Sequence, residues 1–149
     1  MTNPAYLIPD AGQAIQMLLN ATLQGNVPET TLMLAAVRGS QINGGSACLY
    51  ADLLRAEKAG VTDGQLATVA AWRQSPYFTD AERAALALAE AAARMDDKSD
   101  HAVPDALWND LAEHYDEQQR AVLILWIACS GLFNIITNII QEPAGTTWS

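Results

Sequence analysis

The chain has 149 residues, a length that suits one domain over residues 1–149, and half of its residues are hydrophobic, which is enough to form a core. Its formal net charge is −9, from 8 basic and 17 acidic residues, which argues against nucleic acid and anionic membranes as partners. Its two cysteines, Cys48 and Cys129, are too few for a disulfide framework, and residues 1–10 lack the basic and apolar regions of a signal peptide. We therefore expect a cytoplasmic protein with free thiols.

Abundant alanine, helical periodicity and prolines placed between the periodic segments predict an all-α fold, a compact multi-helix bundle. Residues 1–9 are expected to form an extended arm, because Pro4 and Pro9 restrict the backbone. Asp10 is expected to cap the first helix, and Pro28 to begin the second. We expect a bundle of seven or eight helices. The segments predicted to be helical are residues 10–24, 28–38, 46–59, 62–74, 79–95, 104–115 and 116–140.

Two of these helices are predicted to begin with a capping box. Thr62 with Gln65, and Thr79 with Glu82, have the spacing at which each side chain accepts a hydrogen bond from the other residue's free backbone N–H group. Asp116 is expected to cap the long final helix.

The final helix includes an uncharged segment over residues 121–141, close to the ~20 residues that a membrane-spanning helix needs. The segment contains Ser130, Asn134 and Thr137, and no basic residues flank its C-terminal end, which favours a buried core or subunit-interface helix. A helix that is apolar on more than one face must be covered on all sides. We therefore expect a homo-oligomer, in which another subunit covers part of this helix.

Residues 40–60, SQINGGSACLYADLLRAEKAG, hold the best candidate for a chemical site. Residues 43–45 predict a turn, because glycine readily adopts positive φ, and Ser46 is expected to cap the helix that follows. Gly60 is expected to end that helix. This arrangement places Cys48 in the first helical turn, where the helix dipole favours a thiolate.

Two interpretations of Cys48 follow from its position: a thiolate nucleophile that attacks a peroxide or another sulfur, or a small buried apolar residue. Asp52 lies four residues on, on the same helix face, and its negative charge would disfavour the thiolate. If burial keeps Asp52 protonated, it could instead donate a hydrogen bond. The alternative for Asp52 is a solvated carboxylate or an ion-pair partner of Arg55 or Arg38.

The other chemically versatile residues predict no second site. Cys129 lies within the apolar final helix and is expected to be buried, and it could resolve an oxidised Cys48 only if folding brings the two together. His101 and His114 are isolated from both cysteines, and no spacing of potential ligands or glycine-rich motif predicts a metal or a cofactor. Four aromatic residues are expected in the core or an interface: Tyr50, Trp72, Tyr77 and Trp108.

Residues 40–44, Ser-Gln-Ile-Asn-Gly, resemble the alkylhydroperoxidase D-like branch of the carboxymuconolactone decarboxylase family. The motif of that branch is Ser-Gln-x-Asn-Gly-Cys-x-x-Cys-x-x-x-His, with a glutamate twelve residues before the first cysteine. Residues 59–66 and residues 133–134 with Asn138 also fit, so the resemblance extends over residues 27–140. It implies an all-helical fold, commonly trimeric or hexameric, and thiol-dependent peroxide reduction that draws on an external reductant. In another branch of the family, a lactone acid is decarboxylated without cysteine chemistry.

Compared with this motif, the chain keeps one of four reactive groups. Gly45 stands at the first cysteine position, Cys48 at the second, Asp52 at the histidine position and Met33 at the glutamate position. The dithiol of the family therefore cannot form a disulfide here, and the proton relay that the resemblance implies is missing.

Three functions are compatible with these residues. The first is a single-cysteine thiol peroxidase or antioxidant protein that reduces peroxides through Cys48. The alternative is a degenerate, non-catalytic family member that acts as a small-molecule binding or structural protein. The third is a lyase of the carboxymuconolactone decarboxylase type, which would need cations such as Arg38, Arg55 or Arg73 around a pocket.

Overall fold

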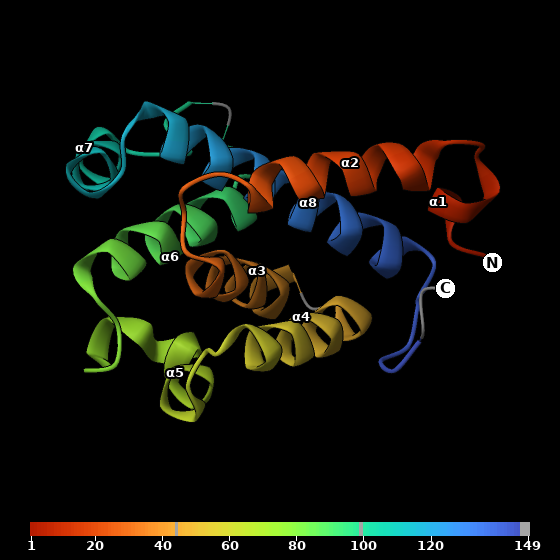
Figure 1. Cartoon of the computed structure of the whole chain (residues 1–149), viewed down its shortest axis with the longest axis horizontal. Helices are drawn as coiled ribbons and strands as arrows, with labels where there is room; N and C mark the ends of the chain where they lie inside the picture. Colours follow the sequence, from red (N-terminus) through yellow and green to blue (C-terminus); the bar gives the residue numbers. More distant parts are fainter. Residues whose placement is uncertain (44, 99, 147–149) are drawn as a thin grey trace.

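The computed structural model describes residues 1–43, 45–98 and 100–146, which form an all-α bundle without strands and confirm the predicted fold class (Figure 1). The elements are α1 (Pro4–Leu7), α2 (Ala11–Leu23), α3 (Glu29–Asn43), α4 (Ser46–Ala59), α5 (Asp63–Thr68), the 3₁₀ helix η1 (Val69–Gln74), α6 (Asp80–Ala93), α7 (Asp105–His114) and α8 (Glu117–Ile139).

Helix α3 is the central element of the bundle. It packs against α4, α6 and α8, and Figure 1 shows it between α4 and α6. Leu32, Leu34 and Val37 are fully buried on it, and each such side chain contributes about 1.5–3 kcal/mol by its removal from water. The indole Nε1 of Trp126 on α8 donates to the Leu32 carbonyl at 2.7 Å, which fixes α8 against α3.

The N-terminal segment differs from the predicted extended arm. Pro4 begins the short helix α1, because a proline at the first helical position lacks only an N–H that would be unpaired there. The side chain of Asn3 caps this helix by accepting from the Ala5 N–H at 3.0 Å. Asp10 precedes α2 but makes no side-chain cap, since its backbone is left-handed (φ 64°), and the predicted Asp10 cap is therefore wrong.

Helix α3 runs to Asn43, five residues beyond the predicted end at Arg38, because its burial on several sides outweighs the low helix propensity of Gly39. The N-cap of α4 is Gly45 and not Ser46, and Gly45 has φ −76°, so the predicted positive φ is also wrong there. The remaining turn residue, Gly44, lies outside the described residues.

Other predicted boundaries hold. Gly60 ends α4 in the left-handed conformation (φ 96°), as predicted. The capping boxes that begin α5 and α6 are both present, and Asp116 forms a third with Gln119 at the start of α8. The helix predicted over 62–74 instead divides at Val69 into α5 and η1, with non-helical backbone at Ala71.

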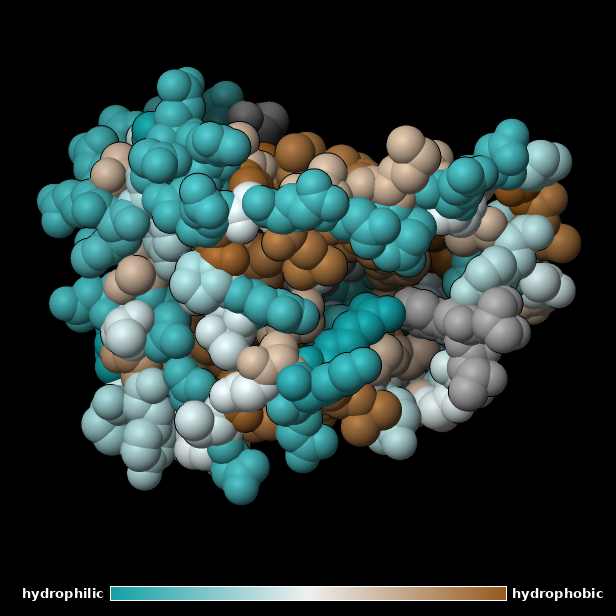
Figure 2. All heavy atoms as spheres, viewed as in Figure 1, coloured by the Kyte–Doolittle hydropathy of each residue, from teal (hydrophilic) through white to brown (hydrophobic). Residues whose placement is uncertain are grey.

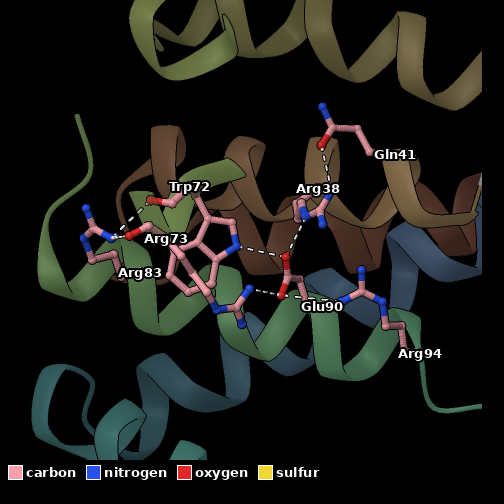
Figure 3. Close-up of polar contacts among 7 residues, drawn as sticks. All are labelled: Arg38, Gln41, Trp72, Arg73, Arg83, Glu90 and Arg94. Carbon is pink, nitrogen blue, oxygen red and sulfur yellow. Dashed lines mark hydrogen bonds and ion pairs between the residues drawn. The ribbon is translucent and has the colours of Figure 1, made fainter. Parts of the chain in front are cut away.

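Glu90 on α6 ties three elements together (Figure 3). Its carboxylate, on a side chain that is only 5% exposed, accepts from Arg38 Nε on α3 at 2.8 Å, Arg73 Nη1 on η1 at 2.6 Å and Trp72 Nε1 on η1 at 3.0 Å. Arg94 Nη1 lies 3.5 Å from Oε2 of the same carboxylate. Burial alone would raise the pKa of Glu90, but the hydrogen bonds from the arginines and the indole outweigh it, and the net pKa lies below its ordinary value.

Helix α8 exposes apolar residues on the side away from the core, as predicted for a helix that needs further cover. By length and composition it could cross a membrane, and 33% of its most apolar window is buried within the fold. The core helices of globular proteins meet the same criterion. Its large residues that remain 40–75% exposed are Ile124, Leu125, Leu132, Ile135 and Ile139.

Candidate active site around Cys48

A cavity of about 380 Å³ opens between α2, α3, α4 and α8, and Figure 2 shows this face of the molecule hollowed between α2 and α4. Apolar and charged residues share its walls. It is lined by Gln16, Leu19, Leu23, Glu29, Met33, Ala36, Cys48, Asp52, Arg55, Lys58, Ala59, Trp126, Ser130 and Phe133.

Cys48 lies in the first turn of α4, as the sequence predicts, and it is one of the residues that line this cavity. The residue is 3% exposed, and its Sγ lies 3.2 Å from Thr137 Oγ1 on α8, a distance at which either group can donate to the other. Burial raises the pKa of the Cys48 thiol, the Thr137 contact lowers it, and the nearby Asp52 carboxylate raises it again, for a net increase. The helix start therefore does not make Cys48 an acidic thiol, contrary to the expectation from its position alone.

Asp52 lies one turn after Cys48 and is 7% exposed, so the solvated-carboxylate interpretation is wrong. Its Oδ2 accepts from Ser40 Oγ at 2.7 Å, and its Oδ1 lies 3.7 Å from Arg55 Nη1. Burial raises the pKa of the Asp52 carboxyl, and the Ser40 hydrogen bond and Arg55 only partly oppose this effect. Arg38, the other suggested partner, binds Glu90 instead.

The position of the family's first cysteine is enclosed by polar atoms of α8. A Cβ atom placed on Gly45 would lie 3.0 Å from Asn134 Oδ1 and 3.6 Å from Thr137 Oγ1. The same Asn134 oxygen accepts from Ser40 Oγ at 3.2 Å, so Ser40 bridges Asp52 and Asn134. The site therefore consists of a thiol and a carboxyl, each held by a hydroxyl group.

Met33, at the family's glutamate position, is 3% exposed and lines the same cavity. Its thioether has no titratable proton, so this position cannot relay one. Of the three arginines considered for anion binding, only Arg55 lines the cavity, together with Lys58, whereas Arg38 and Arg73 both bind Glu90.

Sequence reasoning did not assign Thr137, Ser40 or Asn134 to the site. Ser40 and Asn134 belong to segments that resemble the family, and Thr137 follows Asn134 by three residues and so shares its helix face. That spacing was the feature of the sequence that could have pointed to Thr137. It could not show that the face of α8 meets the start of α4, because 89 residues separate Thr137 from Cys48.

The remaining candidate residues lie outside this site. Cys129 is buried, as predicted, burial raises its pKa, and it forms no disulfide with Cys48. His114 lies at the end of α7 with Asp110 and Glu113, and the ligand atoms of these three residues lie within 4.8 Å of one another. The sequence spacing did not predict this cluster. Among the aromatics Trp72 is buried, whereas the others are at least partly exposed: Trp108, Tyr50 and Tyr77.

We expect Asp52→Asn to lower the pKa of Cys48, because it removes a negative charge that raises that pKa. The rate of iodoacetamide alkylation of Cys48 near pH 8 should increase several-fold, and the midpoint of its pH profile should fall. Glu57→Gln is the matched control, since it removes an exposed carboxylate from the same helix. An unchanged or higher midpoint in Asp52→Asn would show that Asp52 does not control the thiol.

Fold and site together define an all-helical protein with one thiol in a cavity between packed helices. The model of the carboxymuconolactone decarboxylase family matches residues 9–91, more than half of the chain. The uncharacterised protein YdfG of Bacillus subtilis (strain 168) is 34% identical over 123 residues, which span 82% of each chain. The chain belongs to the carboxymuconolactone decarboxylase family.

The chain is also similar to a second curated protein and to a solved structure. The uncharacterised Escherichia coli (strain K12) protein YnjA is 42% identical over 89 residues, 60% of this chain and 46% of that protein. A crystal structure from Agrobacterium tumefaciens, of a protein of unknown function with a suggested AhpD role in antioxidant defence, superposes with a TM-score of 0.86. It shares 22% identity, and 97% of each chain is covered.

A second solved structure with this fold is the debrominase Bmp8, crystallised as a cysteine-to-alanine variant in complex with 2,3,4-tribromopyrrole. It superposes with a TM-score of 0.78 and 22% identity, over 89% of this chain and 70% of that chain. At this level of identity the similarity establishes the fold, which is the AhpD-like fold that the sequence predicts.

Proposed function

We propose that the chain is a single-cysteine thiol peroxidase in which Cys48 reduces organic hydroperoxides. The observation that carries the proposal is the Cys48 thiol in the wall of a cavity large enough for a small molecule, with the Asp52 carboxyl one helical turn away. Glycine at position 45 leaves Cys48 without the second thiol of the family motif, so the oxidised sulfur must be reduced from outside.

Each step of the proposed reaction conserves atoms and electrons. The Cys48 thiolate attacks the terminal peroxide oxygen, the O–O bond breaks, and the alkoxide takes a proton to leave as an alcohol, which gives a sulfenic acid. The thiol proton is lost to water and the alkoxide takes a proton from water, while the Asp52 carboxylate raises the pKa of Cys48 and so opposes formation of the thiolate. One external thiol then forms a mixed disulfide with release of water, and a second external thiol releases Cys48 as the thiol and leaves as a disulfide.

The apolar part of the cavity wall can contact the organic group of a hydroperoxide. Leu19, Leu23, Trp126 and Phe133 provide apolar surface for an alkyl or aryl group. The raised pKa of Cys48 makes the thiolate scarce at neutral pH, so the rate should rise with pH up to and beyond the ordinary thiol value of 9.0.

The direct test is oxidation of Cys48 by cumene hydroperoxide. After reaction with an excess of the peroxide and capture by dimedone, mass spectrometry should find the dimedone adduct on the peptide that contains Cys48. The peptide that contains Cys129 is the internal control and should stay unmodified, because Cys129 is also buried but does not line the cavity around Cys48. Absence of the adduct on Cys48 at pH 9 would contradict the proposal.

A second candidate is small-molecule binding without turnover. It is favoured by the raised pKa of Cys48 and by Met33 in place of a relay carboxylate. A binder would retain a ligand in the cavity and leave Cys48 unoxidised in the same experiment.

We also propose that the protein is a cytoplasmic homo-oligomer. The exposed apolar residues of α8, such as Leu132, Ile135 and Ile139, and Ile8 directly after α1, are those that a second subunit would cover. The family and fold are of the soluble type.

A further inference from the structure

Three arginines share the single carboxylate of Glu90, and a fourth lies beside them. Arg38, Arg73 and Arg94 approach this carboxylate at 2.8, 2.6 and 3.5 Å. Arg83 donates to backbone carbonyls of η1, next to the same cluster (Figure 3). Within the part of the chain that the structure describes, none of the four pairs with another acidic residue. Half of the chain's 8 basic residues therefore surround one negative charge, in a chain whose net charge is −9.

The inner and outer arginines of this cluster differ in their exposure. Arg38, with 11% of its side chain exposed, donates to Oε1 of Glu90, so these two buried charges compensate each other. The side chains of Arg73 and Arg94 are 61% and 50% exposed, and both place Nη1 near the other oxygen, Oε2. The shared oxygen holds the two outer guanidinium groups close together (Figure 3). Their mutual repulsion falls when an anion binds to both.

The outer guanidinium groups keep most of their hydrogen-bond donors. A guanidinium carries several N–H donors in a planar fork that matches the oxygens of phosphate and carboxylate groups. Arg73 donates one N–H to Glu90, and Arg94 approaches the same oxygen without a hydrogen bond to any described residue. The ring of Trp72 supports Arg73, whose Cζ lies 4.2 Å from the ring centroid. This guanidinium is therefore held in place before a ligand arrives.

We propose that Arg73 and Arg94 bind a dianionic oxyanion, the phosphate group of a small molecule, on the outer side of Glu90. A tetrahedral phosphate has oxygens in several directions, so it can accept from guanidinium groups on η1 and at the C-terminal end of α6. Its two negative charges match the two guanidinium charges that Glu90, already paired with Arg38, does not neutralise. Neither outer arginine lines the cavity around Cys48, so this site goes beyond the proposed peroxidase activity.

Titration of ¹⁵N-labelled protein with inorganic phosphate at pH 7.5 and constant ionic strength tests the site. The Nε–H signals of Arg73 and Arg94 should shift and saturate. The indole signal of Trp72 should shift with them, because Trp72 Nε1 donates to the Glu90 carboxylate. The indole of Trp126 is the internal reference and should not shift, since it donates to a carbonyl of α3 inside the core. Acetate, with a single charge, should bind several-fold more weakly than phosphate.

Three variants separate the contributions. Arg73→Gln and Arg94→Gln should each weaken phosphate binding about tenfold, the loss of one charge-assisted hydrogen bond, and each keeps the inner ion pair of the fold. Arg120→Gln is the matched control and should leave binding unchanged. Arg120 also lies over a tryptophan, 5.0 Å from the ring centroid of Trp108, but pairs with no acidic residue among those described.

Phenyl phosphate distinguishes the two sources of a phosphate group. If it binds as tightly as inorganic phosphate, the site accepts phosphate esters, and if only inorganic phosphate binds, the ligand is the free ion. Both results support an oxyanion site at Arg73 and Arg94.

Four results would overturn the proposal. These are shifts without saturation, the same shifts with sodium chloride, unchanged binding in Arg73→Gln and Arg94→Gln, or an equal loss of binding in Arg120→Gln. Light scattering adds one more test: if either outer variant dissociates an oligomer of the wild type, the anion is an acidic side chain of another subunit and the phosphate site is wrong. Oxidation of Cys48 is measured separately, so failure of one proposal leaves the other standing.

Discussion

Replacing Glu90 with glutamine should lower the free energy of unfolding by about 3 kcal/mol, because it leaves the buried guanidinium of Arg38 without its counter-charge. The Arg38 side chain is 11% exposed, so water cannot replace the lost carboxylate. The new amide would also point an NH₂ group at Arg73 or at the Trp72 indole, which are both donors. For a chain of this length we expect the melting temperature to fall by roughly 6–12 °C, measured by calorimetry.

Arg94→Gln is the matched control for this prediction. Arg94 contacts the same carboxylate at 3.5 Å, but its side chain is 50% exposed, so its loss should cost less than about 1 kcal/mol. Equal destabilisation by the two variants would mean that the charge of the cluster matters less than its packing.

The effect of Glu90→Gln should depend on pH in a defined direction. The folded protein lowers the pKa of Glu90, so the carboxylate is bound more favourably in the folded than in the unfolded state. The stabilisation is complete above the ordinary pKa of 4.5 and is lost as the pH falls through the lowered value. The difference in unfolding free energy between wild type and variant should therefore narrow below pH 4.5, and a difference that widens there would contradict this account.

Cys48→Ser should abolish the peroxide consumption that we propose, leaving only the background rate of cumene hydroperoxide with the reductant. A serine hydroxyl keeps the contact with Thr137 but provides neither a thiolate nor a sulfur to oxidise. The measurement is loss of peroxide with dithiothreitol as the external thiol, over a pH series that extends past 9.

Cys129→Ser is the control that removes the other thiol. Cys129 is buried on α8 and does not line the cavity around Cys48, so this variant should keep the full rate. If Cys48→Ser consumes peroxide as fast as the wild type, the peroxidase proposal fails, and binding without turnover becomes the better account of the cavity.

Local signals in the sequence were enough to predict the helices, because each signal involves residues within about one helical turn of each other. Each capping box, at Thr62 and at Thr79, pairs two residues that are three positions apart in the sequence. Gly60 adopts the left-handed conformation that ends α4 because it has no side chain. Predictions from helix propensity were wrong where tertiary packing opposed that propensity. Helix α3 continues through Gly39 because its surroundings bury it, and the segment after Thr68 tightens into η1 although its pattern remains helical.

By itself the sequence determined the all-α class, the family and the place of Cys48 in the first turn of its helix, since each depends on short-range patterns or on a motif. Only the tertiary structure decided the chemistry around that thiol. Burial outweighs the helix start and raises the pKa of Cys48, and Thr137 and Asn134 reach the site from a helix about 90 residues further along the chain. Desolvation and long-range hydrogen bonds arise from packing, and no local pattern encodes the distance between two helices that meet only in the folded bundle.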